Sequence, residues 1–257
     1  MNKKEEEEDK KSEMITLWEK LGDSEKKVLM MRELEGKIMK KEHMIKQLQY
    51  KVETMKTIKL SQKKDAHFFE AVYQAEPPRD IGRPQKEIIQ LEQAGEIVGS
   101  VLDVGCGTGE NALYLAGQGH EVWGIDFTPI AIHKAEEKAT RRNLHVTFLI
   151  LNALELHALG REFDTIIDSG LFHVLSDEER PLFVDNLAAV IRRGGTYFML
   201  CFSEAEPGDY GPRRVTQAEI KASFHNGWRI NYIRQATLEG RLRPSGARGW
   251  LSSISKE

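Results

Sequence analysis

A glycine-rich turn between a short apolar strand and a helix constrains the fold of this 257-residue chain more than any other feature. The turn lies in the segment VLDVGCGTGENALYLA, where glycine recurs at alternate positions: Gly105, Gly107 and Gly109. Glycine lets the backbone leave a strand sharply and lets a ligand approach where a Cβ would intrude. The segment therefore predicts a nucleotide-type site at the end of a strand in an α/β sheet.

The spacing of the glycines indicates which ligand this site takes. A dinucleotide fingerprint needs its third glycine three residues after the second, where this chain has Glu110. No Lys-Ser/Thr pair follows, which argues against a phosphate-cradling P-loop. The pattern G-x-G-x-G, with Asp103 two residues before the first glycine, instead resembles motif I of the class I S-adenosylmethionine-dependent methyltransferases.

Composition excludes several other classes of protein. A net charge of -3 gives no reason to expect a nucleic-acid partner. The two cysteines, Cys106 and Cys201, have neither zinc-site nor disulfide spacing, which indicates a reducing compartment. The start MNKKEEEEDKK lacks the apolar core of a signal peptide, and no stretch approaches the length of a membrane span. We therefore expect a cytoplasmic protein without a membrane partner.

The chain divides by composition into residues 1–65 and residues 66–257. The first part is a charged tail followed by apolar residues in 3-4 spacing, interrupted by Lys41: Met31, Leu34, Ile38, Ile45, Leu48, Val52 and Met55. This spacing predicts a long helix with a coiled-coil seam, which would serve a homo-oligomer or a partner helix through residues 28–58. A solvated single helix that only spaces the domain is the alternative.

Strand and helix patterns alternate through the second part. We expect strands at 101–104, 121–125, 146–151, 163–167 and 196–202, then a hairpin of 228–238 with 250–254. Helices are expected at 67–73, 86–94, 129–142 and 177–190, and after a capping box at Thr216 and Glu219. This order predicts a doubly wound, mostly parallel, seven-stranded Rossmann-like sheet with an antiparallel C-terminal strand, preceded by the long N-terminal helix.

An acidic residue ends the second predicted strand. Asp126 lies about twenty residues past the glycine turn, which is the separation at which a βαβ unit places a carboxylate beside a ribose. A carboxylate suits this position because its two oxygens can accept hydrogen bonds from both ribose hydroxyls. Asp126 is therefore the predicted ribose ligand.

Longer phrases narrow the resemblance. The chain reads PPRDIGRPQ from Pro77, DSGLFHVL from Asp168 and CFSEAEPGDYGPRRVTQAEI from Cys201. These resemble a bacterial subgroup of small-molecule methyltransferases with PPWDIGRPQ and DSGLFHVF, related to the thiopurine methyltransferases. The resemblance runs from about residue 67 to the end of the chain. It implies that PPRDIGRPQ is a lid over the cofactor, although a polar linker would share its composition.

The resemblance implies a set of contacts to S-adenosylmethionine. They are Asp103, Gly105, Cys106, Gly107, Thr108, Gly109, Asp126, Phe127, Asn152, Ala153, Asp168, Ser169, Arg79 and Gly82. Asn152 stands where the family usually has an aspartate, and its amide oxygen is expected to accept from the adenine amino group. Arg79 stands in place of the lid tryptophan and could cover the cofactor with its planar guanidinium.

The predicted reaction is methyl transfer to an O, N or S atom of a small aromatic or heterocyclic acceptor. Such a transfer is an in-line displacement that mainly requires alignment in a dry pocket, and no metal is indicated. His173 is the candidate base, or orders its loop, beside a catalytic Asp168; acceptor contacts are expected from His173, Tyr210, Arg213 and Arg214.

Two other functions stay open from the sequence. A macromolecular methyltransferase is disfavoured because the N-P-P-Y-type phrase after the fourth strand is absent. A catalytically weak scaffold that binds the cofactor and acts through its coiled coil is kept open by Arg79 and Asn152.

Overall fold

The structure is a computed structural model, and it forms two compact units, Met1–Thr57 and Ile58–Glu257. The residues that it describes are 22–23, 31, 36–42, 44–45, 68–74, 77, 80–241 and 243–257.

Only a few residues of the predicted coiled coil are described in the first unit. Residues 36–42 and 44–45 are helical, and the seam residues Met31, Ile38 and Ile45 are exposed. The seam residues Leu34, Leu48, Val52 and Met55 lie outside the described residues. The long helix and its seam therefore stay predictions.

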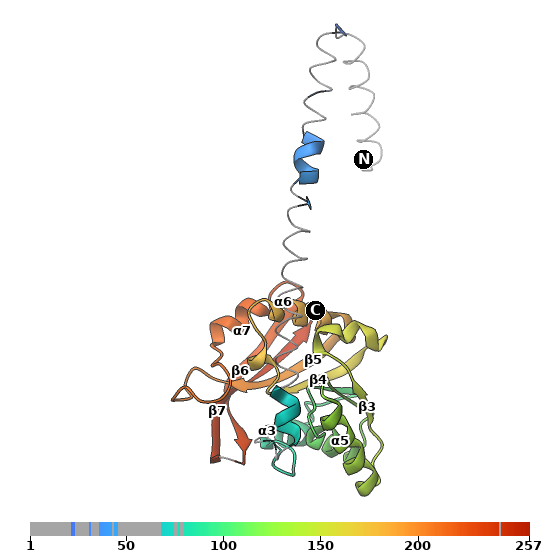
Figure 1. Cartoon of the computed structure of the whole chain (residues 1–257), viewed down its shortest axis with the longest axis vertical. Coiled ribbons are helices and arrows are strands. Elements are labelled where there is room, and N and C mark those ends of the chain that lie inside the picture. The colour runs from blue at the N-terminus through green and yellow to red at the C-terminus, as the bar shows by residue number, and fades with distance from the viewer. Residues whose placement is uncertain are drawn as a thin grey trace. The chain divides into compact units, whose positions relative to one another are not determined.

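The second unit contains a seven-stranded sheet in the order β3-β2-β1-β4-β5-β7-β6 (Figure 1). The strands are β1 (Val101–Val104), β2 (Val122–Asp126), β3 (Thr147–Ile150), β4 (Phe163–Ser169), β5 (Ile191–Phe202), β6 (Trp228–Gly240) and β7 (Arg243–Lys256). Neighbours among β1 to β5 pair in parallel, whereas β7 is antiparallel to both β5 and β6. The predicted mostly parallel sheet with one antiparallel C-terminal strand is confirmed. The chain reverses its direction of travel across the sheet at β1 and β4, where such folds open a crevice for ligands.

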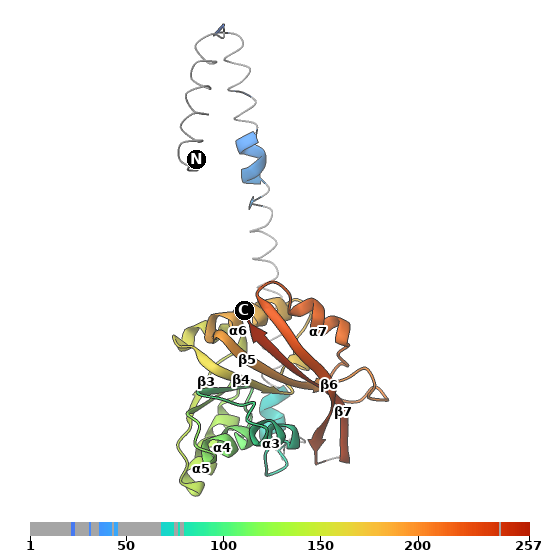
Figure 2. The same cartoon turned by 180° about the vertical axis from the view of Figure 1, so that it is seen from behind.

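Helices cover both faces of the sheet (Figures 1 and 2). One face carries α3 (Lys86–Gln93), α4 (Glu110–Gly117) and α5 (Pro129–Arg142), and the other carries α6 (Glu179–Val190) and α7 (Gln217–Ser223). Two short 3-10 turns, η1 (Ala153–Leu159) and η2 (Phe172–Val174), follow β3 and β4. Successive strand residues face opposite sides, so Val101 and Ile167 join the core under α3 to α5 while Leu102 and Ile166 join the core under α6 and α7.

Most predicted element boundaries are met within a few residues, and the capping box of Thr216 and Glu219 is present at α7. The start of β5 was predicted wrongly. The strand begins at Ile191 and passes through Gly194, which has a φ of 80°, instead of starting after a glycine turn. A Cβ on Gly195 would lie 2.9 Å from the backbone oxygens of Arg192 and Asp164. The glycine pair therefore forms an irregularity inside the strand, where Gly194 takes a positive φ and Gly195 has no room for a side chain.

No helix among the described residues is long and apolar enough to cross a membrane.

Deleting residues 1–57 should leave the sheet unit folded, because the two units are compact separately. We expect the truncated and full chains to have the same melting temperature by circular dichroism. Light scattering should show a smaller oligomer for the truncated chain if the predicted seam associates. Failure of the truncated chain to fold would contradict the two-part division.

Candidate cofactor site

The glycine turn adopts a backbone that only glycine accommodates easily. Gly105, Gly107 and Gly109 have φ values of 70°, 54° and 82°. A Cβ on Gly109 would lie 2.8 Å from Cζ of Phe148 and 2.9 Å from Cβ of Ala135. The turn is closed by the amide of Gly109, which donates to the carbonyl of Cys106 at 3.0 Å. Both conformation and space therefore exclude larger residues, and the turn delivers the chain directly into α4.

Asp126, at the end of β2, holds this turn in place. Its Oδ2 accepts the Gly107 amide at 3.1 Å and its Oδ1 accepts the Thr128 amide at 2.8 Å. Burial raises the pKa of this carboxyl, and hydrogen bonds from Thr128, Gly107 and the Tyr73 hydroxyl oppose the rise. The structure thus brings Asp126 to the glycine turn, as the spacing in the sequence predicts.

Asp103, in the adjacent strand β1, is buried and poorly compensated. Neither of its side-chain oxygens has a hydrogen-bond partner among the described residues. Burial and, after it, the charge of Asp168 raise the pKa of Asp103 to about 8, and Asp126 adds to the rise; the Ala112 amide opposes it without reaching hydrogen-bond geometry. Buried carboxyl oxygens are usually paired, so this pair indicates a site for a ligand that donates hydrogen bonds or carries positive charge.

The residues expected around the adenine are partly engaged elsewhere. The side-chain oxygen of Asn152 accepts the Leu154 amide at 2.9 Å and so caps η1. The expected adenine acceptor is therefore already used as a helix cap. Ala153 is buried beside it, and Phe127 packs edge-on against the ring of Phe69 at 5.6 Å.

The loop with the sequence PPRDIGRPQ contacts the glycine turn through a hydrogen bond between Asp80 and Thr108. Arg79 lies outside the described residues, and Gly82 is exposed with its amide 3.2 Å from Oδ1 of Asp80. Asp80 accepts from the Thr108 hydroxyl at 2.7 Å and pairs with Lys138 at 3.0 Å. Sequence reasoning missed Asp80 and Lys138. Asp80 lies within the recognised phrase, whereas Lys138 is 58 residues away and carries no local signal.

A cavity of about 510 Å³ lies between this loop and α5. It is lined by Pro77, Asp80, Ile81, Gly82, Glu110, Lys134, Lys138, Arg142 and Arg241. Of the predicted cofactor contacts, only Gly82 is among these residues. Lys138 and Arg142 both pair with Glu110, so two of its cationic groups already have partners.

Asp168, at the end of β4, is an internal anchor. It is fully buried and accepts the amides of Leu171 at 2.7 Å and Phe172 at 2.9 Å and the hydroxyl of Tyr197 at 2.8 Å. Ser169 follows it, partly exposed. These bonds shape the turn into η2, so the structure gives Asp168 a positioning task and does not favour the predicted direct catalytic contact.

His173 is arranged to order its loop. The imidazole is buried and its Nδ1 accepts the Phe202 amide at 3.0 Å. A neutral ring in this arrangement carries its proton on Nε2, so neither nitrogen keeps a free lone pair. This geometry argues against His173 as a base and favours the alternative stated from the sequence.

The three predicted acceptor contacts beyond β5 are held by their own surroundings. Arg214 donates to backbone carbonyls of its own loop, among them those of Tyr210 at 2.6 Å and Pro212 at 2.7 Å. The Tyr210 hydroxyl donates to the buried Glu206. These contacts shape the loop and give Arg214 and Glu206 partners within it.

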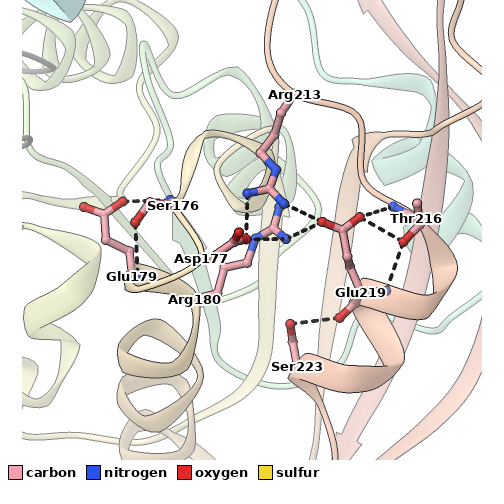
Figure 3. Close-up of polar contacts among 8 residues, drawn as sticks. All are labelled: Ser176, Asp177, Glu179, Arg180, Arg213, Thr216, Glu219 and Ser223. Carbon is pink, nitrogen blue, oxygen red and sulfur yellow. Dashed lines mark hydrogen bonds and ion pairs between the residues drawn. The ribbon is translucent and has the colours of Figure 1, made fainter.

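Arg213 belongs to an ion-pair cluster with α6 and α7 (Figure 3). Figure 3 shows Arg213 and Arg180 converging on Glu219, with Asp177 contacting Arg213 at 2.7 Å. Burial raises the pKa of Glu219, but hydrogen bonds from Thr216, Arg180 and Arg213 lower it to about 2. The cluster therefore stays charged at neutral pH and connects the loop before α7 to the start of α6.

Comparison with known proteins identifies the family. Residues 101–195 match a methyltransferase domain. The chain is 37% identical over 167 residues to the 2-heptyl-1-hydroxyquinolin-4(1H)-one methyltransferase of Mycobacteroides abscessus, across 64% of this chain and 74% of that relative. The chain belongs to the class I S-adenosylmethionine-dependent methyltransferases.

Solved structures agree with this membership. A structure described by the conversion of a disulfide bond into a thioacetal group during echinomycin biosynthesis is 33% identical to the methyltransferase, with a TM-score of 0.68, over 75% of this chain and 93% of that one. The magnesium protoporphyrin IX methyltransferase of Synechocystis, solved with S-adenosylmethionine, shares the fold at 22% identity and a TM-score of 0.53, over 66% and 76% of the two chains.

The residues of the site fit the family's cofactor, S-adenosylmethionine. The glycine turn offers backbone without Cβ atoms, and the unpaired carboxyl of Asp103 is suited to the cationic methionine end of that molecule. Among the described residues, no group of three or more His, Cys, Asp or Glu side chains is placed to hold a metal ion.

Gly109→Ala should destabilise the methyltransferase by about 2 kcal/mol or more, because it combines a positive φ with contact against Phe148 and Ala135. The matched control is Gly95→Ala, at a φ of 70° with nothing within 4 Å of the added Cβ. Urea unfolding should show a clearly smaller loss in the free energy of unfolding for the control. Equal losses would mean that the close approach contributes nothing.

Proposed function

We propose that the methyltransferase transfers the methyl group of S-adenosylmethionine to an O, N or S atom of a small aromatic or heterocyclic molecule. The observation that carries this proposal is the 37% identity to a relative named for a hydroxyquinolone acceptor. The phrases PPRDIGRPQ and DSGLFHVL further support placement in the small-molecule subgroup related to the thiopurine enzymes. Two free cysteines are consistent with action in the cytoplasm.

The cofactor is proposed to lie along the carboxyl ends of three neighbouring strands. Asp126 of β2 would accept the ribose hydroxyls, and Asp103 of β1 would face the methionine end. The glycine turn would lie under the ligand, with Ala153 beside the adenine. The bound cofactor supplies an activated methyl group on a positively charged sulfur.

The protein's part in the reaction is proposed to be alignment. Asp168 fixes the turn that carries His173, and His173 in turn fixes the end of β5 through the Phe202 amide. Since His173 has no free lone pair, an acceptor would have to react as its own anion or as a neutral nucleophile. Acidic hydroxyls and thiols meet this condition near neutral pH.

A panel of hydroxyquinolones, phenols, thiols and N-heterocycles, assayed for methylated product by mass spectrometry, tests the function. Rates should follow the acceptor's own pKa, since the Nδ1 of His173 already accepts the Phe202 amide. A pH–rate profile with the same midpoint for all acceptors, lost in His173→Gln, would restore His173 as the base. Cofactor binding without turnover on any acceptor would favour the scaffold, and no cofactor binding would contradict the enzyme.

Cofactor affinity should rise with pH. The pKa of Asp103 is raised to about 8, so the free protein holds this proton at pH 6, whereas a cationic ligand favours the ionised carboxylate. Binding must then release the proton, and affinity should rise by as much as about tenfold per pH unit below the raised pKa. Titration calorimetry from pH 5.5 to 7.5, in buffers of different ionisation enthalpy, measures both effects. A flat profile without proton release would contradict the placement of Asp103.

The N-terminal seam is proposed to mediate self-association or docking to a partner helix through residues 28–58. The exposure of Met31, Ile38 and Ile45, three seam positions, supports this.

A further inference from the structure

A short helix before the first strand packs onto the cofactor site. Residues 68–74 are helical, and Phe69 contacts Phe127 edge-on at 5.6 Å between ring centroids. The ammonium of Lys134, on α5, donates to the backbone carbonyl of Tyr73 at 2.6 Å. One apolar and one polar contact therefore anchor the end of this helix to the segment that follows β2.

The side chain of Tyr73 enters the glycine turn from this anchored position. Its hydroxyl oxygen lies 2.9 Å from the place where a Cβ on Gly107 would be. The phenol thus uses the space that glycine leaves open for a ligand. Burial, and after it the charge of Asp126, raises the pKa of Tyr73 well above its usual value, so the hydroxyl stays protonated and can donate.

Beside this hydroxyl lies the carboxylate of Asp126, and the Tyr73 hydroxyl opposes the rise in the pKa of that carboxyl. The same carboxylate also accepts the amides of Gly107 and Thr128, which hold it in place. These two amides belong to the glycine turn and to the segment between β2 and α5. Both of their hydrogen bonds to Asp126 can therefore persist when a ligand binds. Tyr73 offers a further donor, which comes from a side chain and not from the backbone.

We propose that the Tyr73 hydroxyl occupies the ribose position in the cofactor-free enzyme and competes with the cofactor for Asp126. This inference rests on the proposed function through the assignment of Asp126 to the ribose. Only the Tyr73 side chain has to move, because Phe69 and the Lys134 contact hold the backbone of the helix. Tyr73 is therefore a positioning residue that holds Asp126 ready but lowers the affinity for the cofactor.

Tyr73→Phe tests the competition, because it removes the hydroxyl and keeps the ring. Calorimetric titration with S-adenosylhomocysteine should show affinity that is higher by several-fold to about tenfold, which is the size expected for one lost competing hydrogen bond. Tyr114→Phe on α4 is the matched control and should leave affinity unchanged. Equal melting temperatures of the variants would show that the packing is retained.

Asp126→Asn and the double variant separate this inference from the proposed function. Asp126→Asn should weaken binding, and Tyr73→Phe should then bring little or no further gain, since the competed carboxylate is gone. Unchanged affinity in Asp126→Asn would overturn the ribose assignment and the inference with it. Weaker binding in Asp126→Asn together with unchanged affinity in Tyr73→Phe would overturn the inference alone.

Two further outcomes would also overturn it. Weaker binding by Tyr73→Phe would mean that the hydroxyl binds the cofactor and does not compete with it. A full gain from Tyr73→Phe in the Asp126→Asn background would mean that the gain arises away from Asp126.

Discussion

The hydrogen bond from the Gly107 amide to Asp126 joins the two parts on which the cofactor site depends. It ties the turn after β1 to the end of β2, and it forms because the three glycines take left-handed backbone conformations. The same conformations let Phe148 and Ala135 approach Gly109 closely, which sets the start of α4 against the sheet. A side chain in the turn would disturb the ligand cradle and the packing of the helix together.

Three acids at the ends of adjacent strands are compensated in three different ways. Asp168 accepts three internal hydrogen bonds, and Asp126 is held by two backbone amides and by Tyr73. Asp103, between them in the sheet, keeps two buried oxygens without hydrogen-bond partners in the part of the chain that the structure describes. The charges of Asp168 and Asp126 raise the pKa of Asp103. A cationic ligand beside Asp103 would therefore stabilise its ionised carboxylate.

The loop before α7, where we expect contacts to the acceptor, is held by a different set of interactions. Three of its polar groups have partners within the protein: Arg214 with loop carbonyls, Arg213 with Asp177 and Glu219, and Tyr210 with Glu206. These contacts hold the loop in shape. Such a loop suits the proposed alignment of a small acceptor by fit.

The sequence by itself determined the sheet, its single antiparallel strand, the glycine turn and the position of Asp126, because hydrophobic period, glycine spacing and the length of a βαβ unit are local. Tertiary structure decided what each polar side chain does. Asn152 caps η1, His173 accepts an amide from β5, and Asp80 meets Lys138 across 58 residues, and none of these partners is visible from spacing. Hydrogen-bond partners brought together from distant segments depend on how strands and helices pack. For that reason the sequence could predict Asp126 as a ribose ligand, while only the fold placed the Tyr73 hydroxyl beside it.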